Sequence, residues 1–296
     1  MPEPTIQFAD YAFWERKLID EGALDTQRKF WERKLTDSGA LGLPVHKRIR
    51  KAAAFLREHQ SLDVDGALFE ELKSFVARRN LTPFTVILTT LYALMHLCTG
   101  QRDLRIGVLV ANRRWRGAES VIGHFVNTIV LPIHVSVGMT FEDLLDLTRE
   151  GVVAIQENQE YPFEALARTI ETESNLERET LFQVLVAYNV ANPTVYPTGP
   201  SFAPLYLRDA QLAENITVTA FDIIFSFSES STELSGSVNY RKGLLRGNSQ
   251  DSVNEFLGSL VEIILFRTST RISGTILAGL PRHILRKRGG TYGPKL

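Results

Sequence analysis

Apolar positions recur along the chain with a helical period in some segments and with strand-like alternation in others. The segment GALFEELKSFVARRN, which follows Asp65, predicts a helix with one apolar face. That face consists of Leu68, Leu72, Phe75 and Val76. The next segment, PFTVILTTLYALMHLCTG, is apolar on nearly all sides and predicts a buried helix that begins at Thr82 and ends at Gly100. Further helices are expected after Thr140 and over residues 249–268.

Shorter runs rich in β-branched residues predict strands. They are AAAFLREHQSLDV, LRIGVLVANR, TIVLPIHVSV and LFQVLVAYNV. Two more, AFDIIFSFSES and ELSGSVNYR, predict an antiparallel pair joined by a polar turn. Because strands and helices are mixed throughout, we expect an α/β or α+β sandwich.

A short repeat lies near the amino terminus. The segments FWERKLIDEGAL and FWERKLTDSGAL, which begin at Phe13 and Phe30, share ten of twelve residues. Both predict helices, which we expect to end at Gly22 and Gly39. Two copies of so short a unit cannot stack into a core, so we interpret the repeat as a local duplication or a chance convergence.

Composition narrows the class of protein. The 296 residues include 33 basic and 34 acidic side chains, so nothing favours a nucleic acid or an anionic membrane as partner. Cys98 is the only cysteine, which excludes a disulfide framework or a multi-thiolate metal site within one chain and favours a reducing compartment. The amino terminus does not have the composition of a signal peptide, and the apolar runs stop short of a membrane span. We therefore expect a soluble, cytoplasmic protein.

Three motifs stand in order along the chain: QFADYAFW, IGHFVNTIVLP and NQEYPFEAL. Together they resemble the carboxyl-half motifs of condensation domains, the peptide-bond-forming domains of nonribosomal peptide synthetases. The resemblance extends from Gln7 to about Pro281, and the chain departs from it at Leu131-Pro132, where the motif usually ends in a polar or basic residue. The structural motif residues are Asp10, Tyr11, Trp14, Gly123, Phe125, Tyr161, Pro162, Phe163 and Glu164.

The resemblance implies an α/β fold like that of chloramphenicol acetyltransferase, a sandwich in which two lobes meet at a cleft. It implies that residues 46–281 form one carboxyl lobe, a mixed β-sheet flanked by helices, and that residues 1–45 form the interlobe connection helices. Residues 282–296 are basic and rich in glycine, and we interpret them as a tail or the stub of a linker. Docking of this tail on an acidic carrier protein is the alternative.

The resemblance also implies the chemistry. Carrier protein domains present acyl groups as thioesters on phosphopantetheine arms, and an amine attacks one thioester to make an amide. No cofactor binds the domain directly. The active-site histidine of the family belongs to an HHxxxDG motif on the amino lobe, and this sequence contains no His-His pair. The implied partners are peptidyl or acyl carrier domains. A separate amino-lobe polypeptide is a further possible partner.

One segment imitates the second half of that motif. In EHQSLDV, His59 and Asp63 have the spacing of HxxxD. However, Glu58 stands in place of the first histidine, Val64 stands in place of the glycine, and the segment follows the interlobe helices instead of preceding them. We therefore assign no catalytic role to His59 and expect no catalytic residue in this chain.

We expect the substrate channel to be lined by His124, Asn127, Thr128, Asp222 and Ser226. The last two alternate with apolar residues along one strand, so they share a face that we expect to look toward the cleft. For His124, a structural or partly exposed position is the competing interpretation. For the Asn-Thr pair, the alternative is that it satisfies buried backbone groups among the apolar strand residues.

The NQEYPFE segment has a mainly structural interpretation. Pro162 sets a turn, and the aromatic residues on either side of it, Tyr161 and Phe163, are expected to pack into the core. Glu164 is expected to begin the next helix, close to its positive end.

Two classes of function fit these observations. In the first, the chain is a condensation-domain carboxyl lobe separated from its amino lobe, and it supplies the channel wall and a carrier-protein surface without condensation activity of its own. In the second, it is a stand-alone acyltransferase that works without the histidine, or a non-catalytic module that binds carrier proteins. We favour the first, because the resemblance begins at the interlobe connection.

Overall fold

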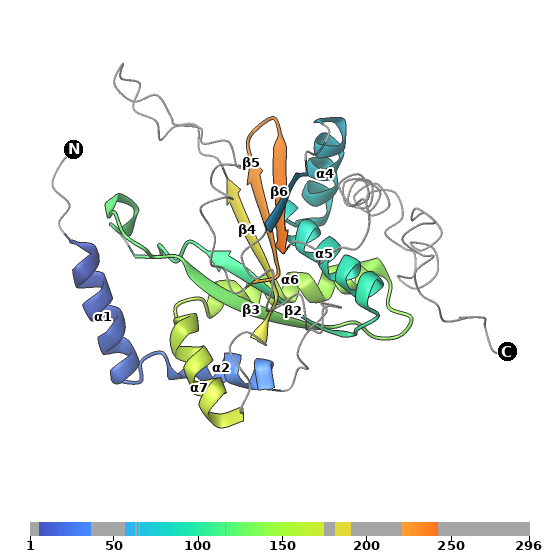
Figure 1. The fold of residues 1–296 in the computed structure, drawn as a ribbon. Helices are drawn as coiled ribbons and strands as arrows, with labels where there is room; N and C mark the ends of the chain where they lie inside the picture. Colours follow the sequence, from blue (N-terminus) through green and yellow to red (C-terminus); the bar gives the residue numbers. More distant parts are fainter. Residues whose placement is uncertain are drawn as a thin grey trace, which may run out of the picture.

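A six-stranded mixed sheet, in the order β1-β6-β5-β4-β2-β3, lies at the centre of the molecule (Figure 1). The computed structural model describes residues 6–36, 57–62, 64, 66–115, 117–174, 181–190 and 221–241. The strands are β1 (Arg57–Ser61), β2 (Asp103–Val110), β3 (Asn127–His134), β4 (Val184–Val190), β5 (Ile223–Glu229) and β6 (Leu234–Arg241). Strand β4 is parallel to β2 and β5, and the other pairings are antiparallel. The expected α/β fold with a mixed sheet is thus confirmed.

The helices begin and end largely where the sequence predicts. They are α1 (Phe8–Asp20), α2 (Asp25–Thr36), α4 (Gly66–Arg79), α5 (Pro83–Thr99), α6 (Phe141–Glu157) and α7 (Phe163–Ser174), with a 3-10 turn, η1 (Ala118–Ser120). Thr82 and Thr140 cap α5 and α6 through their side chains. Gly100, which ends α5, and Gly22, which follows α1, have the predicted left-handed conformation. In α4, the buried face contains Phe69, while Leu68 is only half-buried.

The main core includes the first face of the sheet, the face that carries Val108 of β2. Val108, Val186 and Phe225 lie opposite one another on β2, β4 and β5, and all three are buried. Helix α5 covers this face, because its Phe84 contacts the ring of Tyr188 at a centroid distance of 5.4 Å. Burial of these side chains away from water is the main source of the sheet's stability.

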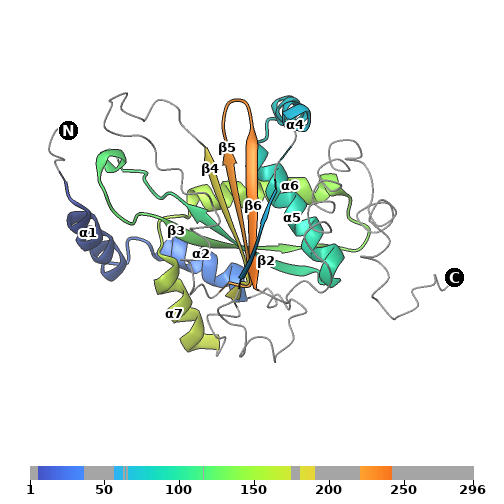
Figure 2. The ribbon, with the colours of Figure 1, turned by 45° about the horizontal axis from the view of Figure 1, so that its top comes forward.

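The second face is partly covered by α2 and α7, which lie side by side near β3 (Figure 2). Two consecutive second-face positions of β2 are covered, one by α2 and the other by Phe182, whose ring lies 5.5 Å from that of Phe163 in α7. Arg105 donates a hydrogen bond to the backbone oxygen of Leu35 in α2, at 2.5 Å. Gly107 lies under the ring of Phe182, whose carbon Cε2 would be 2.2 Å from a Cβ atom at that position. A larger residue there would therefore displace the aromatic ring.

Some sequence-based predictions lie outside the described residues. They are the helix over 249–268, the tail over 282–296 and the helix end at Gly39. In the part of the chain that the structure describes, no helix is both long and apolar enough to cross a membrane.

Candidate functional site

Segment 121–127, which carries most of the IGHFVNT motif, alternates in burial and bends at Gly123. The residues that face inward are Val121, Gly123, Phe125 and Asn127, and those that face outward are Ile122, His124 and Val126. Ile122 is 93% exposed, and His124 is exposed as well. Buried and exposed residues thus alternate as they do along a strand, although within the described residues the segment pairs with no strand before β3 begins.

The side chain of Asn127 joins the two strongest motifs. Its amide nitrogen donates to the backbone oxygens of Gln159 and Tyr161, each at 2.9 Å. Its amide oxygen accepts from the backbone N–H groups of Thr128 and Phe163, at 2.9 and 3.0 Å. An asparagine side chain has two donor hydrogens and two acceptor lone pairs, so all of its capacity is used. Asn127 therefore fixes the NQEYPFE turn against the start of β3.

Helix α2 holds the same turn from another direction. The side-chain oxygen of Gln27 accepts from the backbone N–H groups of Glu160 and Tyr161, at 3.0 and 3.1 Å. The indole N–H of Trp31, which is only 1% exposed, donates to the backbone oxygen of Asn158 at 2.7 Å. The turn is thus held between β3 and α2.

The turn residues themselves are placed by packing. Tyr161 and Phe163 are buried, and α7 begins at Phe163, with Glu164 in its first turn and exposed. Burial raises the pKa of Tyr161. Pro162 lies between the two aromatic residues and is half-buried.

The QFADYAFW motif packs against the loop that leads into segment 121–127. Asp10 accepts a hydrogen bond from the backbone N–H of Gln7 at 2.8 Å and so stabilises the start of α1. Tyr11 donates its phenolic hydrogen to Glu15 at 2.8 Å and accepts from Asn112 at 3.1 Å. Burial, followed by the neighbouring Glu15 carboxylate, raises the pKa of Tyr11.

Two further contacts fasten this loop. The rings of Trp14 and Trp115 meet edge to face with centroids 3.5 Å apart. The guanidinium of Arg113 donates to the backbone oxygens of Ala118, Val121 and Gly123, and it lies over the ring of Phe125. The sequence offers no signal for this role of Arg113, because the residues around a loop arginine do not reveal whether its side chain is solvated or bound to its own loop.

Thr128 and Ser226 lie in one row across the second face of the sheet. Thr128 is opposite Leu109 on β2, and Ser226 is opposite Ala187 on β4. The parallel register of β2 and β4 pairs Val108 with Val186, and its continuation by one residue aligns Leu109 with Ala187. Three strand spacings, about 14 Å in total, therefore separate the two residues. The structure brings these two predicted channel residues to one face without contact between them.

Asp222 has a partner of its own. It is 2% exposed, and its carboxylate lies 3.0 Å from the Nε atom of Arg241 on β6. The backbone N–H of Arg241 also donates to the backbone oxygen of Asp222 at 3.0 Å. A buried carboxylate is retained where a cation neutralises it, so this pair joins the beginning of β5 to the end of β6.

Arg105 is a buried cation that the sequence analysis did not single out. It lies on β2 directly opposite Pro132, the position where the family motif usually ends in a polar or basic residue. Its side chain is fully buried, and burial lowers the pKa of its guanidinium. Because Leu35 is in the last turn of α2, the hydrogen bond from Arg105 places positive charge at the negative end of that helix.

His59 lies apart from these residues. It is on the edge strand β1, with its Nδ1 atom 3.0 Å from the side-chain oxygen of Asn239 on β6. Asp63, which completes the HxxxD spacing, is outside the described residues. Nothing in this arrangement supplies the first histidine of the family motif.

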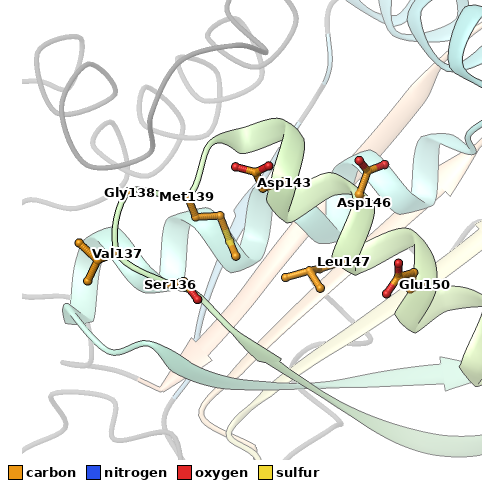
Figure 3. A pocket seen from close by; sticks show the side chains of 8 residues that line it. All are labelled: Ser136, Val137, Gly138, Met139, Asp143, Asp146, Leu147 and Glu150. Atoms are coloured by element: carbon orange, nitrogen blue, oxygen red, sulfur yellow. The ribbon is translucent and has the colours of Figure 1, made fainter.

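The pocket drawn in Figure 3 lies at the connection from β3 to α6 and has a volume of about 500 Å³. Its lining residues are Ser136, Val137, Gly138, Met139, Asp143, Asp146, Leu147 and Glu150. None of the predicted channel residues belongs to it. The described side chains include no group of three that could hold a metal ion.

Comparison with known proteins identifies the family. The model of the condensation domain family matches residues 1–274. Phosphinothricin tripeptide synthetase PhsC of Streptomyces viridochromogenes is 29% identical over 282 residues, which is 95% of this chain and 25% of that protein. The condensation domain of the monacolin K polyketide synthase MokA has a TM-score of 0.74 at 17% identity, over 90% of this chain and 63% of that chain.

A third similarity is to the X-domain from teicoplanin biosynthesis in its complex with OxyB. It has a TM-score of 0.74 at 20% identity, over 92% of this chain and 61% of that chain. The chain thus spans less than two thirds of these solved chains and a quarter of the synthetase. The structural similarities establish the fold, and the family model covers nearly all of the sequence. This chain therefore belongs to the condensation domain family of nonribosomal peptide synthetases.

Proposed function

We propose that this chain forms the carboxyl-lobe wall of a condensation channel and presents a surface to carrier domains. In this role it contributes shape and hydrogen bonds, and the histidine that handles the proton comes from the amino lobe. Phosphopantetheine stays attached to the carrier domain, and the chain itself contributes no catalytic residue. Its partners are carrier domains and an amino-lobe polypeptide.

The observation that carries the proposal is that the side chain of Asn127, in the IGHFVNT motif, binds the NQEYPFE turn. Through the four hydrogen bonds of that side chain, the end of segment 121–127 and the NQEYPFE turn form one support. The support leaves an outward edge made of Ile122, His124 and Val126. A channel that aligns two substrates needs a wall of fixed geometry, and this edge has one.

The chemistry of the reaction explains why a wall without a base is useful. An amine is already a good nucleophile and a thioester is a reactive acyl donor, so alignment supplies much of the rate, up to roughly 7–11 kcal/mol in ideal cases. A positioned general base adds about 10²–10⁴-fold. A carboxyl lobe therefore contributes to alignment, and amide formation awaits the lobe that carries the histidine.

A non-catalytic docking module is the second candidate, and one comparison favours it. The X-domain of teicoplanin biosynthesis, which shares this fold, forms a complex with the protein OxyB. A condensation-like fold thus occurs in a complex with another protein. In that case the chain would bind a partner whether or not a phosphopantetheine arm is present.

Binding and turnover separate the two candidates. Purified chain is titrated with a carrier domain in its apo and phosphopantetheinylated forms, and amide formation is assayed with acyl and aminoacyl carriers, with and without a separately expressed amino lobe. We expect tighter binding of the phosphopantetheinylated form, and amide product only when the amino lobe is added. Amide formed by the chain alone would overturn the wall proposal, and equal binding of both carrier forms would favour the docking module.

A further inference from the structure

We infer that α1 positions the outward edge of segment 121–127 through a small core that is separate from the main one. The coupling between α1 and the segment rests on packing alone. The role of this coupling in shaping a channel wall rests on the proposed function. Phe8 is the positioning residue that this inference assigns.

The small core lies between α1 and the loop of residues 112–126. It contains Ala118, Val121 and Phe125, with Phe8 and Tyr11 of α1 packed against them. No residue of α1 is itself buried, and its contacts with the main core come from its carboxyl half, through Leu18 and Ile19. In Figure 1, α1 lies beside this loop at the left of the view, far from α4 and α5. The amino half of α1 is thus held by the loop.

The closest approach in this core is between Phe8 and Gly123. A Cβ atom at Gly123 would lie 2.2 Å from Cδ2 of the Phe8 ring, so no other residue fits while the ring is in place. The same ring meets Phe125 at a centroid distance of 5.2 Å, edge to face. Phe8 therefore contacts two consecutive inward positions of the segment.

The contact with Phe8 also determines the position of the outward edge, because inward and outward residues alternate along the segment. Gly123 and Phe125 contact Phe8, whereas Ile122, His124 and Val126 are exposed, so the outward edge alternates with the residues that α1 holds. Within the described residues, no backbone N–H of residues 122–126 donates a hydrogen bond. The segment therefore takes its shape from side-chain contacts, chiefly those with Phe8 and Arg113, and not from a strand partner.

The first test releases α1 and measures the loop. Trypsin cleaves after Arg113 only when its guanidinium leaves the three backbone oxygens that hold it, so the cleavage rate there reports the released population. Mass spectrometry measures the rate of cleavage after Arg113. In Phe8→Ala we expect this rate to be at least about tenfold higher than in the unmodified chain. Phe13→Ala is the matched control, because Phe13 is in the same helix and 74% exposed, and its rate should stay unchanged.

The second test uses the tight fit. Gly123→Ala should accelerate cleavage by a similar factor in the unmodified chain, because the new methyl group meets the ring of Phe8. Added to Phe8→Ala, the same substitution should change the rate by less than about twofold, since the clash is gone. Equal acceleration in both backgrounds, or a Phe8→Ala rate equal to that of Phe13→Ala, would overturn the inference. Thermal melting by circular dichroism verifies that the main core stays folded in all variants.

A binding measurement keeps this inference distinct from the proposed function. Each variant is titrated with a phosphopantetheinylated carrier domain, and Phe8→Ala should bind at least about threefold more weakly than Phe13→Ala. If the cleavage results hold and the unmodified chain binds no carrier domain, the proposed function fails and the positioning role stands. If carrier binding holds and the Phe8→Ala and Phe13→Ala cleavage rates agree, the positioning role fails and the proposed function stands.

Discussion

Two tryptophans occupy the same place in a repeated hexapeptide, FWERKL, and have different environments. Trp31 is 1% exposed, and its indole N–H donates to the NQEYPFE turn. Trp14 is half-buried and meets Trp115 at the edge of the molecule. Because the hexapeptide is identical in both copies, it cannot account for the difference in burial between the two tryptophans. At the scale of the residue, burial is decided by what the rest of the fold places opposite each copy.

The repeat supplies its own control for a stability measurement. Trp31→Ala removes a buried ring and a hydrogen bond, so we expect a loss of roughly 3 to 5 kcal/mol in the free energy of unfolding. Trp14→Ala removes a half-buried ring from a satellite contact, and we expect a loss below about 2 kcal/mol. Chemical denaturation of both variants measures the difference. Equal losses would contradict the burial that separates the two copies.

Asn127 allows a second prediction at this scale. Asn127→Asp keeps the shape of the side chain but removes the donors that serve Gln159 and Tyr161. Two backbone oxygens lose their partners and face a carboxylate, so we expect a loss of at least about 2 kcal/mol at neutral pH. Thr128→Val, which alters the neighbouring half-buried residue, should cost less than about 1 kcal/mol. Similar losses in both variants, measured by denaturation, would show that the four hydrogen bonds of Asn127 carry no special weight.

At the scale of the element, local residues decide where helices begin. Thr140 and Asp143 cap α6 reciprocally: the hydroxyl of Thr140 accepts from the Asp143 N–H at 3.1 Å, and the Asp143 carboxylate accepts from the Thr140 N–H at 2.8 Å. Hydrogen bonds from the Thr140 side chain and backbone lower the pKa of Asp143 below its ordinary value of 3.8. Such a cap depends on residues three apart, so the sequence predicted it correctly.

This shift in pKa predicts how the helix responds to acid. Because the pKa of Asp143 is lower in the folded chain, its stabilisation is present above the ordinary value and is lost as the pH falls through the folded value. Asp143→Asn should lower Tm at pH 7, and the difference from the unmodified chain should shrink as the pH falls below about 3.8. Asp146→Asn removes another exposed carboxylate of α6 and controls for net charge. A Tm difference that persists undiminished in acid would contradict the cap.

The two amino-terminal helices show that an element's attachment is a tertiary matter. Gln27 of α2 binds Glu160, 133 residues away, and Arg105 binds Leu35, 70 residues away. Both helices have similar length and a similar aromatic-tryptophan pair, so pattern alone treats them alike. Only α2 contributes side chains to the main core as buried residues.

At the scale of the molecule, exposed apolar side chains gather on α1 and the loop beside it. Of the described large apolar residues that are exposed, α1 carries Phe13, the loop carries Trp115, Ile122 and Val126, and Ile6 precedes the cap of α1. Large exposed apolar patches mark surfaces that another molecule covers. The proposed function assigns this surface to contact with the amino lobe.

The proposed separation from an amino lobe therefore has a physical consequence in solution. We expect the purified chain to self-associate as its concentration rises, and light scattering coupled to size-exclusion chromatography measures this. Ile122→Lys, which places charge at the most exposed apolar position, should lower the association, and Val190→Lys, at the carboxyl end of β4 and outside α1 and the loop, should lower it less. A monomer at all concentrations would argue against an uncovered lobe face.

The sequence by itself determined the family, the mixed α/β architecture and most helix ends. Each of these depends on short-range information: motifs in order, apolar periodicity, and caps such as Thr82 and Gly100 that act within a few residues. Only the tertiary structure decided that Asn127 closes the NQEYPFE turn, that Arg113 organises its own loop and that Asp222 is paired with Arg241. A polar side chain looks the same in a sequence whether it lines a channel or satisfies buried groups. Its role is set by the partners that folding brings to it from distant parts of the chain.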